Sequence, residues 1–448
     1  MFVTGLLKMV SPKFPKVLVV ALGRINANDL YNNGLFLRNL FGAEWPKDNL
    51  AQIFSSGDTG DSGFFAHYYC LGPQERVLGD LFYRVRPNQI ASSNAPGITP
   101  SGVVRREGLL KRVVNSLLVE TGLYELVFRP KLSREMLDWV NEFKPDVILA
   151  QGYNLTFSWL PLMLKKETGA KLAVLTTDDW PKYLYSGLLG ESKIFRWVVR
   201  PFVSRAARNL FAAADIPCAF GLPMAEEYKR RYGKNFFTFD HTDNAERFLS
   251  AKPIKVSMSP TRTIVAIGTF NEYRLPLLLD IDRACEALSR RGLDIRLAVF
   301  SSAIYRPGRA AVESAKYIDV YPDPGHDALP SYLKGADVLL LAEGFEEDFV
   351  SAIELSVSSK SHLFMLSKKP ILVYGAEKTG VVKYAKNLSW GRVVSERSIT
   401  VLADAIYELL ENKAVIERLI SSGWDAAEQN HSRARNQAKF FRALGVES

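Results

Sequence analysis

The sequence predicts an α/β protein with two doubly wound parallel sheets, each in its own Rossmann-like domain. Three observations support this fold class. The chain has 448 residues, more than one ordinary hydrophobic core accommodates, so we expect two or three domains. Short apolar runs alternate with helical segments in both halves, which is typical of parallel sheets covered by helices on both faces. A stretch without periodicity separates the halves.

Three apolar runs predict buried strands in the first half. They are residues 16–22 (KVLVVAL), 145–150 (PDVILA) and 171–176 (KLAVLT). The second and third runs follow helical segments at residues 132–143 and 160–168. We therefore expect repeated strand–helix units, because neighbouring parallel strands need a long crossover connection, usually a helix.

The same pattern starts again in the second half. Residues 262–267 (RTIVAI) predict a strand, followed by a helix at 275–291 and a strand at 294–300. Two further buried strands are expected at residues 336–342 (ADVLLLA) and 371–374 (ILVY). The second half is therefore expected to form its own parallel sheet.

The predicted organisation has four segments. They are a Rossmann-like domain at residues 14–245, a linker at 246–261, a second Rossmann-like domain at 262–425, and a helical tail at 426–448 that packs back on the first domain. Ligands of such sheets bind at the carboxyl ends of the strands, so we expect the domains to face each other across a cleft. No G-x-G-x-x-G follows the first strand, which argues against a dinucleotide site.

The composition indicates a soluble globular protein, with 47% apolar and 23% charged residues. No apolar run reaches the roughly 18 residues that a membrane-spanning helix needs. Cys70, Cys218 and Cys285 lie far apart and lack metal-ligand spacing, which fits a reducing compartment and apolar packing. We therefore predict a cytoplasmic location and no metal site.

The formal net charge of +9 is concentrated in two segments, residues 103–127 and 193–208. Both have the pattern of an amphipathic helix with a basic side. Such a helix either rests on an anionic lipid surface, here the inner face of the cytoplasmic membrane, or is simply a solvated face. Neither segment carries a named nucleic-acid motif, so we expect no nucleic-acid partner.

Residues 355–375 (LSVSSKSHLFMLSKKPILVYG) are the most informative stretch. They predict a short helix capped by serines, a dibasic turn at Pro370 and a buried strand. Lys360 falls in the first helical turn, where the helix dipole disfavours a cation. A cation there suits a site that holds several negative charges, because helix starts also bind phosphate. The alternative is an ordinary capped helix without a ligand.

Several blocks together resemble bacterial glycosyltransferases of the GT-B fold, near family 4 (group 1). They are TTDDWPKYLY around Asp179, GLPMAEEYKRRYG at residues 221–233, IGTFNEYR at 267–274, ADVLLL at 336–341, and the Ser-Ser-Lys stretch that ends at Lys360. Each block is weak alone, but their order and spacing make the resemblance specific for the fold. It covers about residues 17–444.

This resemblance implies a hexosyltransferase-like enzyme. Such an enzyme moves a sugar from a nucleotide-diphosphate sugar to a polysaccharide or lipid-linked glycan acceptor, with retention of configuration. The second domain would bind the donor and the first the acceptor. No metal or other cofactor is expected, because fixed cations and a helix end can stabilise the departing diphosphate. The alternative is a catalytically silent GT-B module that binds nucleotide or glycan.

Most of the predicted site residues lie in or near these blocks, whereas Asn33 and Gly34 lie in the long loop after the first strand. Arg274 and Lys360 would clamp the diphosphate, since Arg offers a bidentate fork and Lys a point charge. The predicted donor-binding residues are Gly268, Thr269, Arg274, Ser356, Ser359, Lys360 and Glu346. The predicted acceptor-binding residues are Asn33, Gly34 and Asp179. The predicted catalytic residues are Asp178, Asp179, Arg274 and Lys360.

Most of these residues also have a structural interpretation. Arg274 can be a surface charge at a helix start, Asp179 can be an N-cap, and Asn33 with Gly34 can form a turn. His241, one of five histidines, is interpreted as structural rather than catalytic.

The chain departs from the family pattern at two positions. Leu363 stands where relatives have the acid that binds the donor ribose, and Lys368 stands where glycine is usual. Glu346 and Glu354 match the spacing of two acids found in retaining relatives, but both precede the Ser-Ser-Lys helix. The loss of the acid at Leu363 is the reason to keep the silent module as an alternative.

Overall fold

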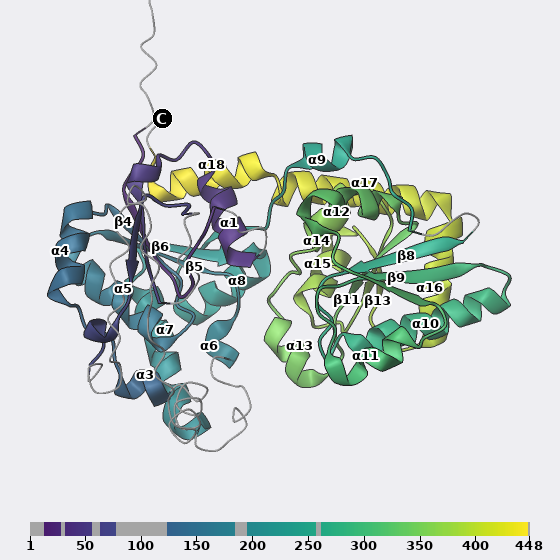
Figure 1. Ribbon diagram of the computed structural model, residues 1–448, viewed down its shortest axis with the longest axis horizontal. Coiled ribbons are helices and arrows are strands. Elements are labelled where there is room, and N and C mark those ends of the chain that lie inside the picture. The colour runs from purple at the N-terminus through teal and green to yellow at the C-terminus, as the bar shows by residue number, and fades with distance from the viewer. Residues whose placement is uncertain are drawn as a thin grey trace, which may run out of the picture. The chain divides into compact units, whose positions relative to one another are not determined.

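The computed structural model describes residues 13–27, 32–55, 63–77, 123–183, 195–256 and 261–446. The chain divides into two compact units. Unit 1 is Met1–Phe239 together with Gln437–Ser448, and unit 2 is Asp240–Asn436. Each unit contains one parallel sheet flanked by helices (Figure 1), as the sequence predicts.

Unit 1 has a seven-stranded sheet in the order β3-β2-β1-β4-β5-β6-β7, and every pairing is parallel. The strands are β1 (Val17–Val20), β2 (Leu50–Phe54), β3 (His67–Cys70), β4 (Val147–Ala150), β5 (Lys171–Thr176), β6 (Ile216–Phe220) and β7 (Phe237–Phe239). The predicted strands at β1, β4 and β5 are confirmed. The strand order reverses beside β1, which pairs with both β2 and β4.

Helices connect these strands, and capping residues define where some of these helices begin and end. The described helices of unit 1 are α1 (Asn32–Phe41), α3 (Leu123–Val127), α4 (Arg134–Phe143), α5 (Leu155–Thr168), α6 (Trp180–Tyr183), α7 (Arg200–Ala213) and α8 (Gly221–Tyr232). The short turns are η1 (Lys47–Asn49), η2 (Pro73–Glu75) and the π-helical η4 (Phe195–Val199). Asn154 caps α5 by accepting a hydrogen bond from the Phe157 amide at 2.8 Å. Gly169 ends this helix in the left-handed conformation at φ +69°.

Unit 2 has a six-stranded parallel sheet in the order β10-β9-β8-β11-β12-β13. The strands are β8 (Arg262–Ile267), β9 (Ile295–Phe300), β10 (Ile318–Tyr321), β11 (Val338–Ala342), β12 (Ile371–Tyr374) and β13 (Arg392–Val394). The predicted strands at β8, β9, β11 and β12 are confirmed. Here the order reverses beside β8, whose neighbours are β9 and β11. Ligands of doubly wound sheets bind at such a reversal.

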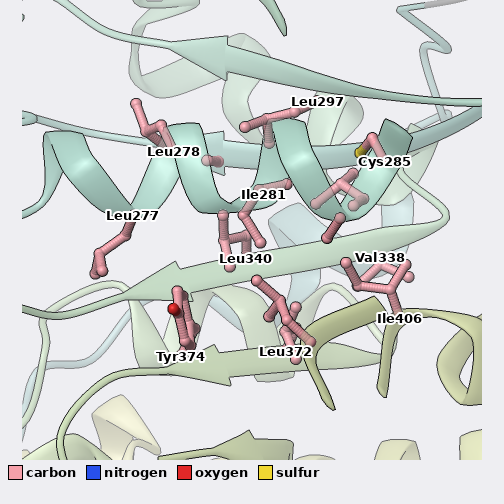
Figure 2. Close-up of a cluster of buried hydrophobic side chains, with 14 of the residues drawn as sticks. Leu277, Leu278, Ile281, Cys285, Leu297, Val338, Leu340, Leu372, Tyr374 and Ile406 are labelled. Carbon is pink, nitrogen blue, oxygen red and sulfur yellow. The ribbon is translucent and has the colours of Figure 1, made fainter. Parts of the chain in front are cut away.

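The helices of unit 2 cover both faces of this sheet. They are α9 (Ala245–Ser250), α10 (Leu275–Arg290), α11 (Arg306–Glu313), α12 (Gly325–Gly335), α13 (Glu347–Ile353), α14 (Ser361–Leu366), α15 (Gly380–Leu388), α16 (Ile399–Glu411) and α17 (Lys413–Asn430). On one face, α10 and α16 pack together over the strands. Figure 2 shows Ile281 of α10 near Leu340 of β11. Burial raises the pKa of the Cys285 thiol in this core to about 12, so Cys285 packs as a small apolar residue.

Two predicted segments differ in detail. The predicted linker at 246–261 contains most of α9, because Asn244 caps this helix by accepting from the Glu246 amide at 3.0 Å. The predicted tail at 426–448 is not one helix, since α17 ends at Asn430 and α18 (Arg433–Leu444) follows. The chain returns to unit 1 within α18.

The end of α18 is anchored in unit 1 by aromatic side chains. Phe440 is fully buried, and its ring centroid lies 5.1 Å from that of Phe41 and 5.5 Å from that of Phe239. Phe441 packs against Trp45 at 5.3 Å. Aromatic pairs at these separations add to the free energy gained by burial alone. Unit 1 therefore depends on a segment that follows unit 2 in the sequence.

We predict that Phe440→Ala lowers the free energy of unfolding by about 3–5 kcal/mol, because it removes a buried ring and leaves a cavity. Urea denaturation followed by circular dichroism measures this loss. Lys439→Ala, at the exposed neighbouring position, is the control and should stay within about 0.5 kcal/mol of wild type. Equal stability of the two variants would contradict the anchoring role of Phe440.

Candidate functional site

The carboxyl end of β8 carries a glycine that a lysine side chain covers. Gly268 has φ +112°, a conformation that L side chains rarely adopt, and its amide donates to the Phe300 carbonyl at 3.0 Å. A Cβ added at Gly268 would lie 2.2 Å from Cε and 2.9 Å from Nζ of Lys360. The absence of a side chain at Gly268 thus leaves the space in which the Lys360 amino group lies.

Lys360 immediately precedes α14 and reaches the ends of the central strands. The pKa of its ammonium group is lowered to about 8, mainly by burial and to a smaller extent by the positive charge of Arg274. The negative charge of Glu343 acts in the opposite direction and raises this pKa. The cation is therefore poorly compensated by the protein. An anion bound beside it would restore that compensation, which is the electrostatic condition for a phosphate site.

Arg274 is held in place by a buried acid. Its Nε and Nη2 atoms donate to Oε2 of Glu343 at 3.0 and 2.7 Å. Glu343 directly follows β11 and is 4% exposed. At the backbone, the Asn271 side-chain oxygen accepts from the Arg274 amide at 3.1 Å. Glu343 is not among the predicted site residues, although its place directly after an apolar strand was the signal that could have found it.

Aromatic side chains support the same loop. The rings of Tyr273 and Phe349 stack with centroids 4.7 Å apart at 15° between their planes, and the Arg274 guanidinium lies 5.6 Å from the Phe349 centroid. Glu346 is at the N-cap position of α13, and its Oε2 accepts from the Phe345 amide at 3.1 Å. These contacts couple the start of α13 to the loop that carries Arg274.

The sequence predicts a serine-capped helix before the dibasic turn, and the predicted start of this helix is wrong. The helix α14 begins at Ser361, its N-cap is Lys360, and no side chain caps it. The serines lie in the preceding turn, where Ser359 is exposed and Ser356 contacts the start of α15 through Gly380. Thr269 is exposed. Of the predicted donor residues, the structure brings together Gly268, Arg274 and Lys360 most closely.

The two departures from the family pattern have different consequences. Leu363 packs against the core beneath α14 and offers no polar group. Lys368 adopts the left-handed conformation at φ +53°, which suits the glycine that the family resemblance leads us to expect there. Its ammonium lies 3.9 Å from the Trp424 ring centroid, which is a cation–π contact.

In unit 1, Asp179 is held by fixed contacts. Its Oδ1 accepts from Arg231 Nη1 at 2.6 Å and from the Tyr228 hydroxyl at 3.0 Å, and its Oδ2 accepts from Arg231 Nη2 at 3.0 Å. The Asp179 side chain is only 3% exposed. Because protein donors engage both carboxylate oxygens, this residue fastens α8 to the loop after β5.

The carboxyl group of Asp178 has different surroundings from that of Asp179. Burial raises the pKa of its carboxyl group, and the Thr177 hydroxyl donates to Oδ2 at 3.3 Å. The hydroxyl groups of Thr177 and Tyr153 are hydrogen-bonded to each other, and burial raises the pKa of Tyr153. Asp178 and Tyr153 therefore stand together at the carboxyl ends of β5 and β4, next to the strand-order reversal of unit 1.

The remaining predicted residues are placed as follows. Asn33 and Gly34 lie in the first turn of α1, where Gly34 is buried, and the Asn33 side chain is outside the described part of the chain. Most of the basic segment at 103–127 is also outside the described residues, whereas 195–208 is described as η4 and the start of α7.

Three histidines form a stack in unit 2. The ring centroids of His241 and His362 are 6.1 Å apart, and those of His362 and His431 are 5.6 Å apart. Burial lowers the pKa of His241 to about 3 and that of His431 to about 4, so both are neutral at physiological pH. Among the described residues, no group of three or more His, Cys, Asp and Glu side chains could hold a metal ion. The stack therefore supports the structural interpretation of His241.

Comparison with known proteins supports a fold for this chain, because only solved structures resemble it. No family model matches the chain, and no curated protein matches its sequence. Solved structures align with nearly the whole chain. WaaG, a glycosyltransferase involved in lipopolysaccharide biosynthesis, is 11% identical with a TM-score of 0.56, over 96% of this chain and 100% of WaaG. HepE of Anabaena in complex with UDP is 11% identical with a TM-score of 0.57, over 96% and 99%.

A third similar structure is α,α-trehalose 6-phosphate synthase from Burkholderia multivorans, which is 11% identical with a TM-score of 0.59 over 96% of both chains. At these identities the likeness establishes the fold alone. With its two parallel-sheet units, the protein has the GT-B fold. The resemblance to family 4 stays a prediction. No helix in the described ranges is both long and apolar enough to cross a membrane.

We predict that Asp179→Asn lowers the free energy of unfolding by about 1.5–3 kcal/mol, because it removes the charged acceptor of Arg231.

Asp178→Asn should not destabilise the protein at neutral pH. The carboxyl of Asp178 has a raised pKa when folded, so its contribution is lost as pH rises from its ordinary value of 3.8 through the folded value.

Chemical denaturation of both variants between about pH 3 and pH 8 tests these signs. The stability of Asp178→Asn relative to wild type should rise with pH and then level off. If Asp178→Asn destabilised the protein as strongly as Asp179→Asn at neutral pH, the raised pKa of the Asp178 carboxyl would be contradicted.

Proposed function

We propose that this protein is a glycosyltransferase that moves a sugar from a nucleotide-diphosphate sugar to an acceptor hydroxyl. The observation that carries the proposal is the position of Lys360, whose amino group lies over Gly268 at the strand-order reversal of unit 2. Arg274 supplies a second cation beside it, since it contributes to the lowered pKa of Lys360. A diphosphate is the ligand that these paired cations fit best.

The proposed chemistry depends on charge that develops as the sugar leaves. When the bond from the sugar to the diphosphate breaks, negative charge accumulates on the leaving phosphate oxygen. Lys360 and Arg274 stabilise that charge without reorganising, because Gly268 and Glu343 fix their positions in advance. No metal or other cofactor is needed in this proposal, because the two side chains supply the positive charge.

The acceptor side is proposed to lie in unit 1. Asp178, with its raised pKa, orients an acceptor hydroxyl and takes part in its deprotonation. Asp179 positions the loop, through Arg231, rather than contacting substrate. A polysaccharide or lipid-linked glycan as acceptor, hexosyl transfer and retention of configuration follow from the family resemblance alone. We place this activity in the cytoplasm, at the inner face of the cytoplasmic membrane.

A uridine nucleotide is the first donor to test. HepE, which shares the fold, was solved in complexes with UDP and with UDP-glucose. The second candidate function is a catalytically silent module that binds nucleotide or glycan. Leu363, which offers no polar group for a ribose, favours it. Transfer or hydrolysis of a labelled nucleotide sugar would exclude this alternative.

We predict that the matching nucleotide diphosphate stabilises wild type, by about 2.7 kcal/mol at a free concentration 100-fold above its dissociation constant. Lys360→Ala should abolish most of this effect because it removes one of the two cations. A thermal-shift panel of UDP, GDP, ADP, TDP and their common sugars measures it. Lys386→Ala, which loses only an exposed pair with Glu377, is the control. An equal shift in both variants would contradict the proposed site.

We predict that affinity for a nucleotide sugar falls as the pH rises from about 7.5 to 9.5. The free protein loses the Lys360 proton near pH 8, and the neutral amine no longer attracts the diphosphate. A nucleotide sugar is the suitable probe because its phosphates do not titrate in this range. Calorimetric titration should show this decline for wild type and a flat profile for Lys360→Met. A wild-type profile as flat as that of the variant would argue against Lys360 as the phosphate cation.

A further inference from the structure

Unit 1 carries an exposed surface that is both aromatic and basic. Residues 193–214 include five cations and no acid. Within this stretch, Trp197 is 81% exposed, and Val198 and Phe202 are 43% and 40% exposed. Single exposed apolar residues are normal, but three within six positions on η4 and the start of α7 form a patch. We call these three residues and the flanking Arg200, Arg205 and Arg208 the α7 surface.

The α7 surface adjoins a groove between α5 and α7, which pack side by side (Figure 1). The groove has a volume of about 450 Å³. Trp159, Leu162, Met163 and Phe202 supply its apolar walls, and Arg129 and Arg205 add positive charge. The Arg129 guanidinium lies 5.7 Å from the Trp159 ring centroid. Its shape and chemistry suit a molecule with an apolar body and an anionic end.

The arginines of this surface are available to a partner. Arg200, Arg205 and Arg208 are exposed, and no salt bridge joins them to a carboxylate within the described ranges. Guanidinium groups pair with phosphate through two parallel hydrogen bonds. Trp side chains favour the boundary between water and hydrocarbon, because the ring is apolar and its N–H is polar.

We infer that the α7 surface docks on a membrane containing anionic phospholipid. Trp197, Val198 and Phe202 would enter the headgroup region, with the arginines on lipid phosphates and the groove beside Phe202 receiving apolar lipid segments. This assignment is independent of the donor site in unit 2. A nucleic acid would match the charge but leaves the exposed Val198 and the apolar groove without a role, so the lipid surface fits better.

Vesicle flotation tests the inference with the full chain. Wild type should float with vesicles of phosphatidylglycerol and phosphatidylcholine at low salt, bind pure phosphatidylcholine weakly, and lose binding as salt increases. Arg200→Glu with Arg205→Glu should weaken binding at least about tenfold. Trp197→Ser with Phe202→Ser should do the same without changing the net charge.

A matched control variant lies in unit 2. Arg290→Glu with Tyr407→Ser changes one exposed cation and one exposed aromatic residue, and it should bind vesicles as wild type does. Failure of wild type to float at low salt would overturn the inference. So would full binding by Trp197→Ser with Phe202→Ser, because the apolar contact would then be absent. The thermal-shift panel with nucleotides reports on unit 2, so failure of the donor site is recognised separately.

Discussion

The close approach of Lys360 to Gly268 is the constraint on which the candidate donor site depends. The end of the Lys360 side chain, Cε and Nζ, lies where a side chain on residue 268 would stand, and burial there lowers the pKa of the amino group to about 8. Arg274 adds positive charge, while the buried Glu343 holds that arginine in place and limits the repulsion between the two cations. The protein accepts this arrangement at a cost in stability, which an anionic ligand would offset.

Much of the fold could be predicted from periodicity. Strands such as β1, β8, β11 and β12 are continuous apolar runs, and buried parallel strands have few alternatives in sequence. Helix boundaries are harder to predict from the sequence where a single capping residue decides where a helix begins. Asn244 starts α9 inside the predicted linker, and His431 and Ser432 interrupt the predicted tail. Such boundaries depend on individual side-chain hydrogen bonds, which apolar periodicity does not report.

The candidate site was predictable only in part. Arg274 and Lys360 were recognisable from their blocks, and the reason for Gly268 emerged only with the position of Lys360. Glu343 directly follows an apolar strand, but its role depends on pairing with Arg274, which lies 69 positions earlier in the chain. Asp178 and Asp179 look equivalent in sequence, yet Arg231 and Tyr228 engage only the second. Residue-level roles depend on partners far away in the chain, such as the 52 positions between Asp179 and Arg231.

Calorimetric titration of Gly268→Ala with nucleotide sugars tests whether the close approach of Lys360 to Gly268 forms the donor site. Gly292→Ala is the matched control, because Gly292 also has a positive φ, at +85°, but an added Cβ there meets nothing within 4 Å. Both positions have a φ that L side chains rarely adopt, and only at residue 268 does an added Cβ meet Lys360. We predict that Gly268→Ala weakens nucleotide-sugar binding at least about tenfold, the equivalent of one lost charge-assisted contact, while Gly292→Ala binds as wild type. Equal binding by wild type and both variants would contradict it.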